Sequence, residues 1–352
     1  MSKPERHRTK PRGTAEARQL AELARAAGFG DSPDDALEWH REAQAFLETD
    51  EETPLLADVL RWQAVVLRDR GRTSDAEPLF ARSLAVATRL GYEAGRAHAL
   101  NQMSSLALRR GDLVAAANSL SDALVLAQQA GESRLVGMIQ QNLGIVADIR
   151  GNPAAAIAHY RLALRMLEEA NDAQATCWVL NNLGYLLVRE GGFDEAREAF
   201  ERALGIARAR GDLMSEGILE GNRAELRLMA GEPNEALAGI RRSLEIAERR
   251  GDDIRRAGAL KLLGAHQRLV GRPGEAVDTL RRALTSSAVA EDAVLGAEVL
   301  YQLGQALADL GDADAARQAW GAALDAFERM SARQWVGRAR ERLSAGGTGR
   351  YL

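Results

Sequence analysis

Glycine recurs along this chain at an interval of 40 residues, and this period limits the possible folds more than any other feature. A second set of glycines lies halfway between members of the first, so a turn falls about every 20 residues. This spacing leaves room for two helices per repeat, each of about 16–18 residues and about 25 Å long. The first set is Gly71, Gly111, Gly151, Gly191, Gly231, Gly271 and Gly311, and the second includes Gly91, Gly131, Gly211 and Gly251.

Apolar residues keep the same phase as the glycines. Alanine lies five residues after each glycine of the first set, a large apolar residue follows four residues later, and leucine four residues after that. These offsets share one face of a helix, which predicts the buried face of the second helix in each repeat. The first helix has a small residue in register, which predicts a close approach between the two helices. The small residues are Ala64, Ser104, Gly144, Gly184, Ala224, Gly264 and Gly304.

Turn residues support the same helix boundaries. Asp112 and Asp312 each follow a turn glycine, where an aspartate side chain can cap the next helix. Pro153, Pro233 and Pro273 stand where proline is tolerated, in the first turn of a helix. We therefore expect helix–turn–helix units throughout the chain.

The repeats define the domain organisation. The phase runs over about residues 14–331, which gives about eight repeats, and residues 332–344 predict a capping helix for the last one. Residues 1–13 carry five basic side chains and one acidic side chain and are expected to form a disordered leader. Residues 345–352 are rich in glycine and are expected to form a flexible tail.

This pattern resembles the tetratricopeptide repeat, TPR, whose motif pairs an apolar residue with Gly or Ala in the first helix. A glycine turn follows, and then Ala, an aromatic residue and Ala in the second helix. The repeat here has 40 residues rather than the usual 34. In this it is similar to the kinesin light chain and Pins/LGN group and to the TPR arms of bacterial MalT- and AfsR-type regulators. The resemblance implies an all-α, right-handed superhelical TPR solenoid whose first helices line the concave wall. The motif is matched by Leu143, Gly144, Gly151, Ala156, Tyr160 and Ala163, and one repeat later by Leu183, Gly184, Ala196, Phe200 and Ala203.

Composition and missing motifs exclude several classes of protein. One cysteine, Cys177, leaves no disulfide framework and no multi-cysteine metal site. There is no signal peptide and no apolar run long enough to span a membrane, so we expect a cytoplasmic, bacterial protein that does not bind membranes. The net charge of -4 argues against nucleic acid as a partner. The histidines lack metal-ligand spacing, and nucleotide-binding and nucleophile motifs are absent, so we expect no cofactor, no metal and no enzymatic activity.

Amide side chains form a repeated column in the first helices. Asparagine is unfavourable inside a helix, so its recurrence there needs a reason. Because an amide both donates and accepts hydrogen bonds, a column of amides can bind the backbone of an extended peptide. The resemblance to the kinesin light chain and Pins/LGN groups implies such peptide capture. Alternatively, the amides bond between adjacent helices and set the pitch of the solenoid. The column contains Asn142, Asn182 and Asn222, with Asn101, Gln141 and Asn181 at the preceding position.

Aromatic and apolar side chains share a helix face with these amides. Trp178, Asn181 and Tyr185 have helical spacing, and one repeat earlier Met138, Gln141 and Ile145 have the same spacing. An exposed stripe of this kind is typical of a protein-binding hot spot. The alternative is that Trp178 and Tyr185 belong to the core.

Three cations are predicted at the depth of the groove and could take an acidic ligand. They are Arg189, Lys261 and Arg268. The two-carboxylate clamp of some TPR proteins needs Lys and Asn at set positions in successive helices. Lys261 stands alone here, which argues against an acidic chaperone tail as the ligand.

The sequence therefore predicts a non-catalytic scaffold or adaptor that binds a peptide segment or helix of a partner protein in the concave groove. The alternative is a regulatory arm that senses a small ligand or peptide and acts on a separate effector or transcription regulator. The pattern indicates no oligomeric state.

Overall fold

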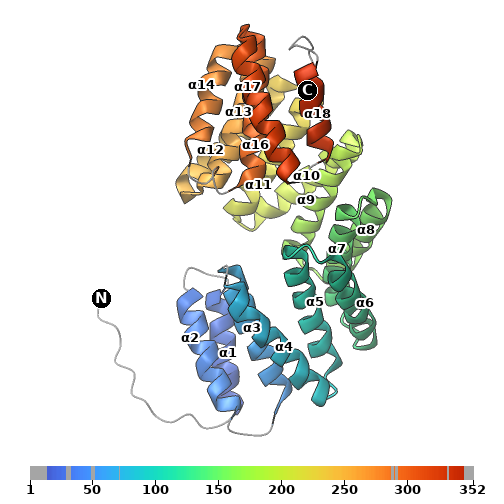
Figure 1. Cartoon of the computed structure of the whole chain (residues 1–352). Helices are drawn as coiled ribbons and strands as arrows, with labels where there is room; N and C mark the ends of the chain where they lie inside the picture. The colour runs from blue at the N-terminus through green and yellow to red at the C-terminus, as the bar shows by residue number, and fades with distance from the viewer. Residues whose placement is uncertain are drawn as a thin grey trace, which may run out of the picture. The chain divides into compact units, whose positions relative to one another are not determined.

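The computed structural model describes residues 14–28, 33–48, 52–70, 72–286, 289, 292–330 and 333–344. These residues form α-helices and no strand among them (Figure 1). The leader and tail predicted at 1–13 and 345–352 lie outside the described residues. The chain divides into two compact units, Met1–Ala175 (unit 1) and Thr176–Leu352 (unit 2).

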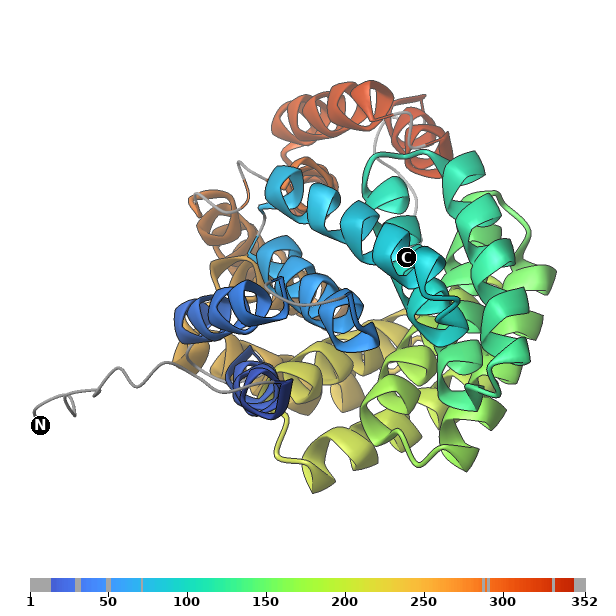
Figure 2. The same cartoon turned by 90° about the horizontal axis from the view of Figure 1, so that it is seen from below.

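Unit 1 is built from successive pairs of helices, which run from blue to green in Figure 2. In each pair, the two helices pack against each other, and the second helix packs against the first helix of the next pair. The bounds are α1 Thr14–Gly28, α2 Pro33–Leu47, α3 Pro54–Asp69, α4 Thr73–Arg89, α5 Glu93–Arg109, α6 Leu113–Gln129, α7 Ser133–Ile149 and α8 Pro153–Glu169; the next helix, α9 Ala173–Arg189, contains the boundary between the units.

Unit 2 continues the alternation and ends in one additional helix. Helix α14 has 12 residues, fewer than the 16–18 expected. It ends where Thr285 turns its hydroxyl to the Arg282 carbonyl, at a run of Thr and Ser that favours local side-chain bonds over helix. The bounds are α10 Phe193–Ala209, α11 Leu213–Met229, α12 Pro233–Arg250, α13 Asp253–Leu269, α14 Pro273–Leu284, α16 Ala293–Leu310, α17 Ala313–Arg329 and α18 Arg333–Ser344.

The turns have the predicted chemistry. Gly151 adopts a φ of 74°, in the left-handed region that glycine enters without a steric penalty. Where the glycine series is interrupted, Asn171 takes its place with a φ of 54°, and asparagine is among the side chains that tolerate this region best. Asp112 and Asp312 accept hydrogen bonds from the amides of Ala115 and Ala315, as expected of N-caps.

The small-residue column is confirmed as the place where paired helices approach closely. A Cβ at Gly144 would lie 2.5 Å from Cε1 of Tyr160, and a Cβ at Gly304 would lie 2.5 Å from Cδ1 of Trp320. Tyr160 and Trp320 belong to the large apolar column of the second helices and are buried. The two columns therefore interlock, with a ring occupying the space that the missing side chain leaves.

An ionic network in α10, α11 and α12 takes the place of apolar core and was not predicted. Glu216 and Glu220 are buried, at 8% and 2% exposure. Arg208 donates to Glu220 at 2.5 Å, Arg223 donates to Glu220 at 2.7 Å, and Arg242 donates to Glu216 at 3.0 Å. Such pairs satisfy carboxylates that would otherwise be very unfavourable in the interior.

The predicted capping helix corresponds to α18, which packs beside α17 (Figure 1). Trp335 of α18 stacks on Phe327 at 5.2 Å and meets Tyr301 edge-on at 5.5 Å. The indole thus covers the apolar end of the last repeat.

Candidate ligand-binding surface of unit 2

Part of the amide column bonds to itself across successive repeats. In unit 1, Asn142 of α7 donates to Asn101 of α5 at 2.9 Å. In unit 2, Asn222 of α11 donates to Asn181 of α9 at 2.7 Å. These four side chains therefore tie together the first helices of consecutive repeats. The hydrogen bonds favour the pitch-setting interpretation for them, although each amide has further donor and acceptor capacity.

Trp178 and Tyr185 lie on the solvent side of α9. Their exposed fractions are 44% and 49%, whereas Val179 and Leu186, one residue further along, are buried. Helix α9 thus has a packed face and an aromatic outer face. Asn182 is half-buried between the two aromatic residues in the sequence.

The corresponding residues one repeat earlier belong to unit 1. Met138, Gln141 and Ile145 are half-buried on α7. The remaining predicted site residues, apart from Asn101 and Asn142, lie in unit 2, so only the latter are considered together below.

A cavity of about 350 Å³ in unit 2 brings five predicted residues together. It is referred to below as the larger cavity. Its walls come from first helices α9, α11, α13 and α16, with Phe200 of α10 and two residues of α18. The predicted residues that line it are Tyr185, Arg189, Asn222, Lys261 and Arg268.

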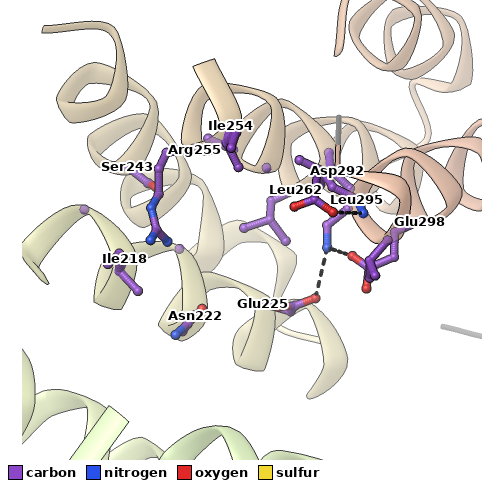
Figure 3. Close-up of a pocket in the computed structure, with 16 residues that line it drawn as sticks. Ile218, Asn222, Glu225, Ser243, Ile254, Arg255, Leu262, Asp292, Leu295 and Glu298 are labelled. Carbon is purple, nitrogen blue, oxygen red and sulfur yellow. Dashed lines mark hydrogen bonds and ion pairs between the residues drawn. The ribbon is translucent and has the colours of Figure 1, made fainter. Parts of the chain in front are cut away.

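A second cavity, of about 270 Å³, adjoins the larger one. This smaller cavity shares Asn222, Glu225, Lys261 and Leu262 with it and extends along α11, α13 and α16 (Figure 3). The two cavities therefore form a continuous hollow over the first helices of unit 2.

Lys261 is held between two carboxylates in the wall that the cavities share. Its Nζ lies 2.5 Å from Oε2 of Glu298 and 3.7 Å from Oε1 of Glu225, as the dashed lines in Figure 3 show. Burial acts to lower the pKa of Lys261, but the two carboxylates outweigh it and the net pKa is raised. Lys261 is therefore a neutralised cation and is less available to an incoming acid than the sequence suggested.

The arginines of the larger cavity are less completely paired. The Arg268 side chain is only 9% exposed and donates through Nη1 to Asp309 at 3.2 Å. Its Nε is buried and has no hydrogen-bond partner among the described residues. Arg338 of α18 lies over the Trp335 ring, 5.2 Å from its centroid, and both line the cavity.

Sequence reasoning missed four residues of this surface, and the repeat would have revealed two of them. Glu225 lies 40 residues after Tyr185 and so shares its column. Glu298 lies three repeats after Trp178 in the same way. Trp335 and Arg338 come after the last repeat, where no column could predict their place.

The structure also describes the groups considered for other chemistry. Among the described residues, no group of three His, Cys, Asp or Glu side chains is arranged to hold a metal ion. Burial raises the pKa of the Cys177 thiol to about 11, which is unfavourable for a nucleophile. In the same part of the chain, no helix is both long and apolar enough to cross a membrane.

Comparison with known families identifies the class of protein. Models of the tetratricopeptide repeat match residues 95–169, 135–209, 215–287 and 297–327. Because these ranges cover more than half of the sequence, the chain belongs to the tetratricopeptide repeat family, and the predicted all-α TPR solenoid is confirmed. A search of the curated proteins found no significant match.

Solved structures share the fold at low sequence identity. A STAND protein with a tetratricopeptide repeat sensor from Pyrococcus horikoshii is 14% identical with a TM-score of 0.67, over 96% of this chain and 50% of that one. A Rap protein complexed with Competence and Sporulation Factor is 12% identical with a TM-score of 0.63, over 95% of this chain and 98% of that one. In the APC/C hetero-tetramer Cut9–Hcn1, the similar chain is 15% identical with a TM-score of 0.60, over 93% of this chain and 58% of that one. This chain thus spans half of the STAND protein.

Proposed function

We propose that this protein is a non-catalytic, cytoplasmic scaffold that binds an extended segment of a partner protein along the first helices of unit 2. The observation that carries the proposal is the exposure of Trp178 and Tyr185 on one face of α9. Large aromatic side chains are expensive to leave in water and are enriched at binding hot spots. Tyr185 also lines the larger cavity, so the aromatic face leads into a hollow that can hold a side chain.

Polar groups beside these aromatic residues support peptide binding. Asn182 lies between them in the sequence, and Asn222 lines both cavities. Amide groups can bind a peptide backbone whatever its side chains are, while the cavities select among side chains. This combination suits a binding protein better than an enzyme, which needs acid, base or nucleophilic groups converging on one point.

Selection from a phage-displayed library of random dodecapeptides tests the proposal. We expect the parent chain to enrich a family of related peptides and a Trp178→Ala, Tyr185→Ala double variant to lose them. Val125→Ala is the matched control, because Val125 is similarly exposed but lies on α6 of unit 1. All chains are compared by thermal melting. Failure of the parent to enrich any peptide family, or retention of the peptides by an equally stable double variant, refutes the proposal.

A sensor is the second candidate, and the larger cavity favours it. Its volume lies near the lower end of the range for small-ligand sites, which is about 300–1,000 Å³. Two structurally similar proteins are, by their descriptions, a TPR sensor and a Rap protein bound to a signalling factor. A sensor would bind a small molecule or short peptide and change its affinity for an effector protein. A metabolite library screened by thermal shift would favour the sensor only if a hit loses its effect in Tyr185→Ala.

A further inference from the structure

The larger cavity has more basic than acidic groups in its wall. Four cationic side chains line it, Arg189, Lys261, Arg268 and Arg338, against one carboxylate, that of Glu225. Since Lys261 is neutralised by Glu225 and Glu298, the positive potential of the cavity comes from its arginines. A wall of this kind attracts anionic groups.

Two of the arginines have donors to spare. The buried Nε of Arg268 lacks an acceptor within the described part of the chain, although the side chain is more than nine-tenths buried. A buried donor without a partner is unfavourable and is rare in folded proteins. Arg338 stacks on Trp335, and among the described residues no carboxylate forms an ion pair with it. Both guanidinium groups can therefore accept an anionic ligand without breaking an existing pair of Arg338.

Aromatic rings stand next to these cations. Tyr185, Phe200 and Trp335 line the same cavity, with aliphatic side chains of α11 and α13 between them. The site thus offers an apolar surface and guanidinium donors side by side. A ligand that satisfies both must carry a carboxylate close to a large apolar side chain.

We infer that the larger cavity binds an acidic side chain of a partner's internal segment together with a neighbouring aromatic or large aliphatic side chain. The carboxylate lies against the guanidinium groups of Arg268 and Arg338, and the apolar side chain lies against Tyr185 and Trp335. Because the hollow continues past Asn222 into the smaller cavity, a chain can extend beyond the anchor, which favours an internal segment over a chain end. This inference rests on the proposed function and specifies its ligand.

The composition of the library-selected peptides is the first test. We expect Asp or Glu within one or two positions of Phe, Tyr, Trp or Leu in the enriched family. No enrichment at all refutes both the proposed function and this inference. An enriched family without an acidic residue, or with a basic one in its place, leaves the proposed function standing and overturns the inference alone.

Synthetic peptides from the enriched family locate the carboxylate. Replacing the acidic residue by its amide, Glu by Gln or Asp by Asn, is expected to weaken binding about tenfold, as loss of one charge-assisted hydrogen bond would. The same peptides with an amidated C-terminus are expected to bind unchanged. If amidation abolishes binding while the side-chain replacement does not, the cavity takes a chain end and the inference is wrong.

Variants of α18 identify the protein partner. Arg338→Gln is expected to weaken the acidic peptide about tenfold and to leave the Gln or Asn peptide unaffected. Arg340→Gln is the matched control, since it removes the same charge from the same helix but Arg340 pairs with Glu328 and does not line the cavity. Equal losses in both variants, or equal losses for both peptides, contradict the assignment. Because the peptide replacement needs no protein variant, the inference stays testable if Arg338→Gln loosens α18.

Discussion

Gly239 lies so close to Glu220 that a Cβ at position 239 would be 3.0 Å from the Glu220 carbonyl oxygen and 3.1 Å from its Oε2 atom. Glu220 cannot easily move away, because Arg208 and Arg223 hold its carboxylate. The glycine in α12 is therefore part of the ionic network in α10–α12, as the position that leaves room for a buried acid.

Gly239→Ala tests this relationship. Alanine is favoured over glycine inside a helix by about 1 kcal/mol, so an unhindered replacement would stabilise the protein. At position 239 we expect the crowding against Glu220 to cancel this gain and to give net destabilisation. Gly205→Ala is the control, since a Cβ there meets nothing within 4 Å, and it should stabilise. Urea denaturation followed by circular dichroism measures both, and a stabilising Gly239→Ala would contradict the packing described.

Replacement of Glu220 by leucine is expected to destabilise the protein by about 3 kcal/mol, because it removes one partner of a buried ion pair. Leucine stands at the positions equivalent to Glu220 and Arg223 in other repeats, at Leu260 and Leu263. We therefore expect Arg223→Leu to restore part of the loss when combined with Glu220→Leu. Glu245→Ala removes an exposed acid from the same network and should cost less than about 1 kcal/mol. Additive losses in the double variant would show that the two residues are not coupled.

Acid is expected to destabilise unit 1 through His98 of α5. Burial lowers the pKa of His98 from 6.5 to about 3, with Arg61 and Arg134 adding to the effect. Below pH 6.5 the unfolded chain binds a proton that folded His98 does not, so stability falls as the pH is lowered from 6.5 toward 3. The contribution is at most about 1.4 kcal/mol per pH unit.

The comparison between parent and His98→Gln isolates this contribution. His159 and His266 also have pKa values lowered by burial, so the parent chain should lose stability through them as well. Urea midpoints at pH 7 and pH 5 are expected to differ less in His98→Gln than in the parent. Identical pH dependence in the two chains would show that His98 is freely protonated when folded.

Asn222→Ala and Asn182→Ala distinguish the two roles considered for the amide column. Asn222 donates to Asn181, and loss of this bond is expected to lower the stability by about 1 kcal/mol. Asn182→Ala should have a smaller effect on stability and should weaken the binding of a library-selected peptide. Melting curves and peptide titrations on both variants measure this. Normal peptide affinity in Asn182→Ala would assign the column to structure alone.

The repeat made the fold predictable from local patterns. Interval, turn glycines, caps and the interlocking columns each concern residues within one helix pair, and all were confirmed, including Asn171 in place of a turn glycine. The exposure of Trp178 and Tyr185 could be expected only as one of two possibilities, because helical spacing defines a face but not what covers it.

The polar pairings could not be predicted because their partners come from different helices. Glu220 and Gln140 occupy the same position in two repeats, yet Glu220 pairs with arginines, while Gln140 lies 2.7 Å from Nδ1 of His159. Lys261 likewise read as a free cation until Glu225 and Glu298 were placed beside it. Only the tertiary structure shows which of several nearby acids a long side chain meets.

Helix α18 both closes the last repeat and supplies Trp335 and Arg338 to the larger cavity. Terminal helices are the elements that open at lowest free energy, so α18 samples undocked states more often than the interior helices do. Each undocked molecule lacks two walls of the cavity. The affinity of any ligand held there thus includes the fraction of molecules with α18 in place, and occupancy in turn protects the C-terminal amides from exchange with solvent.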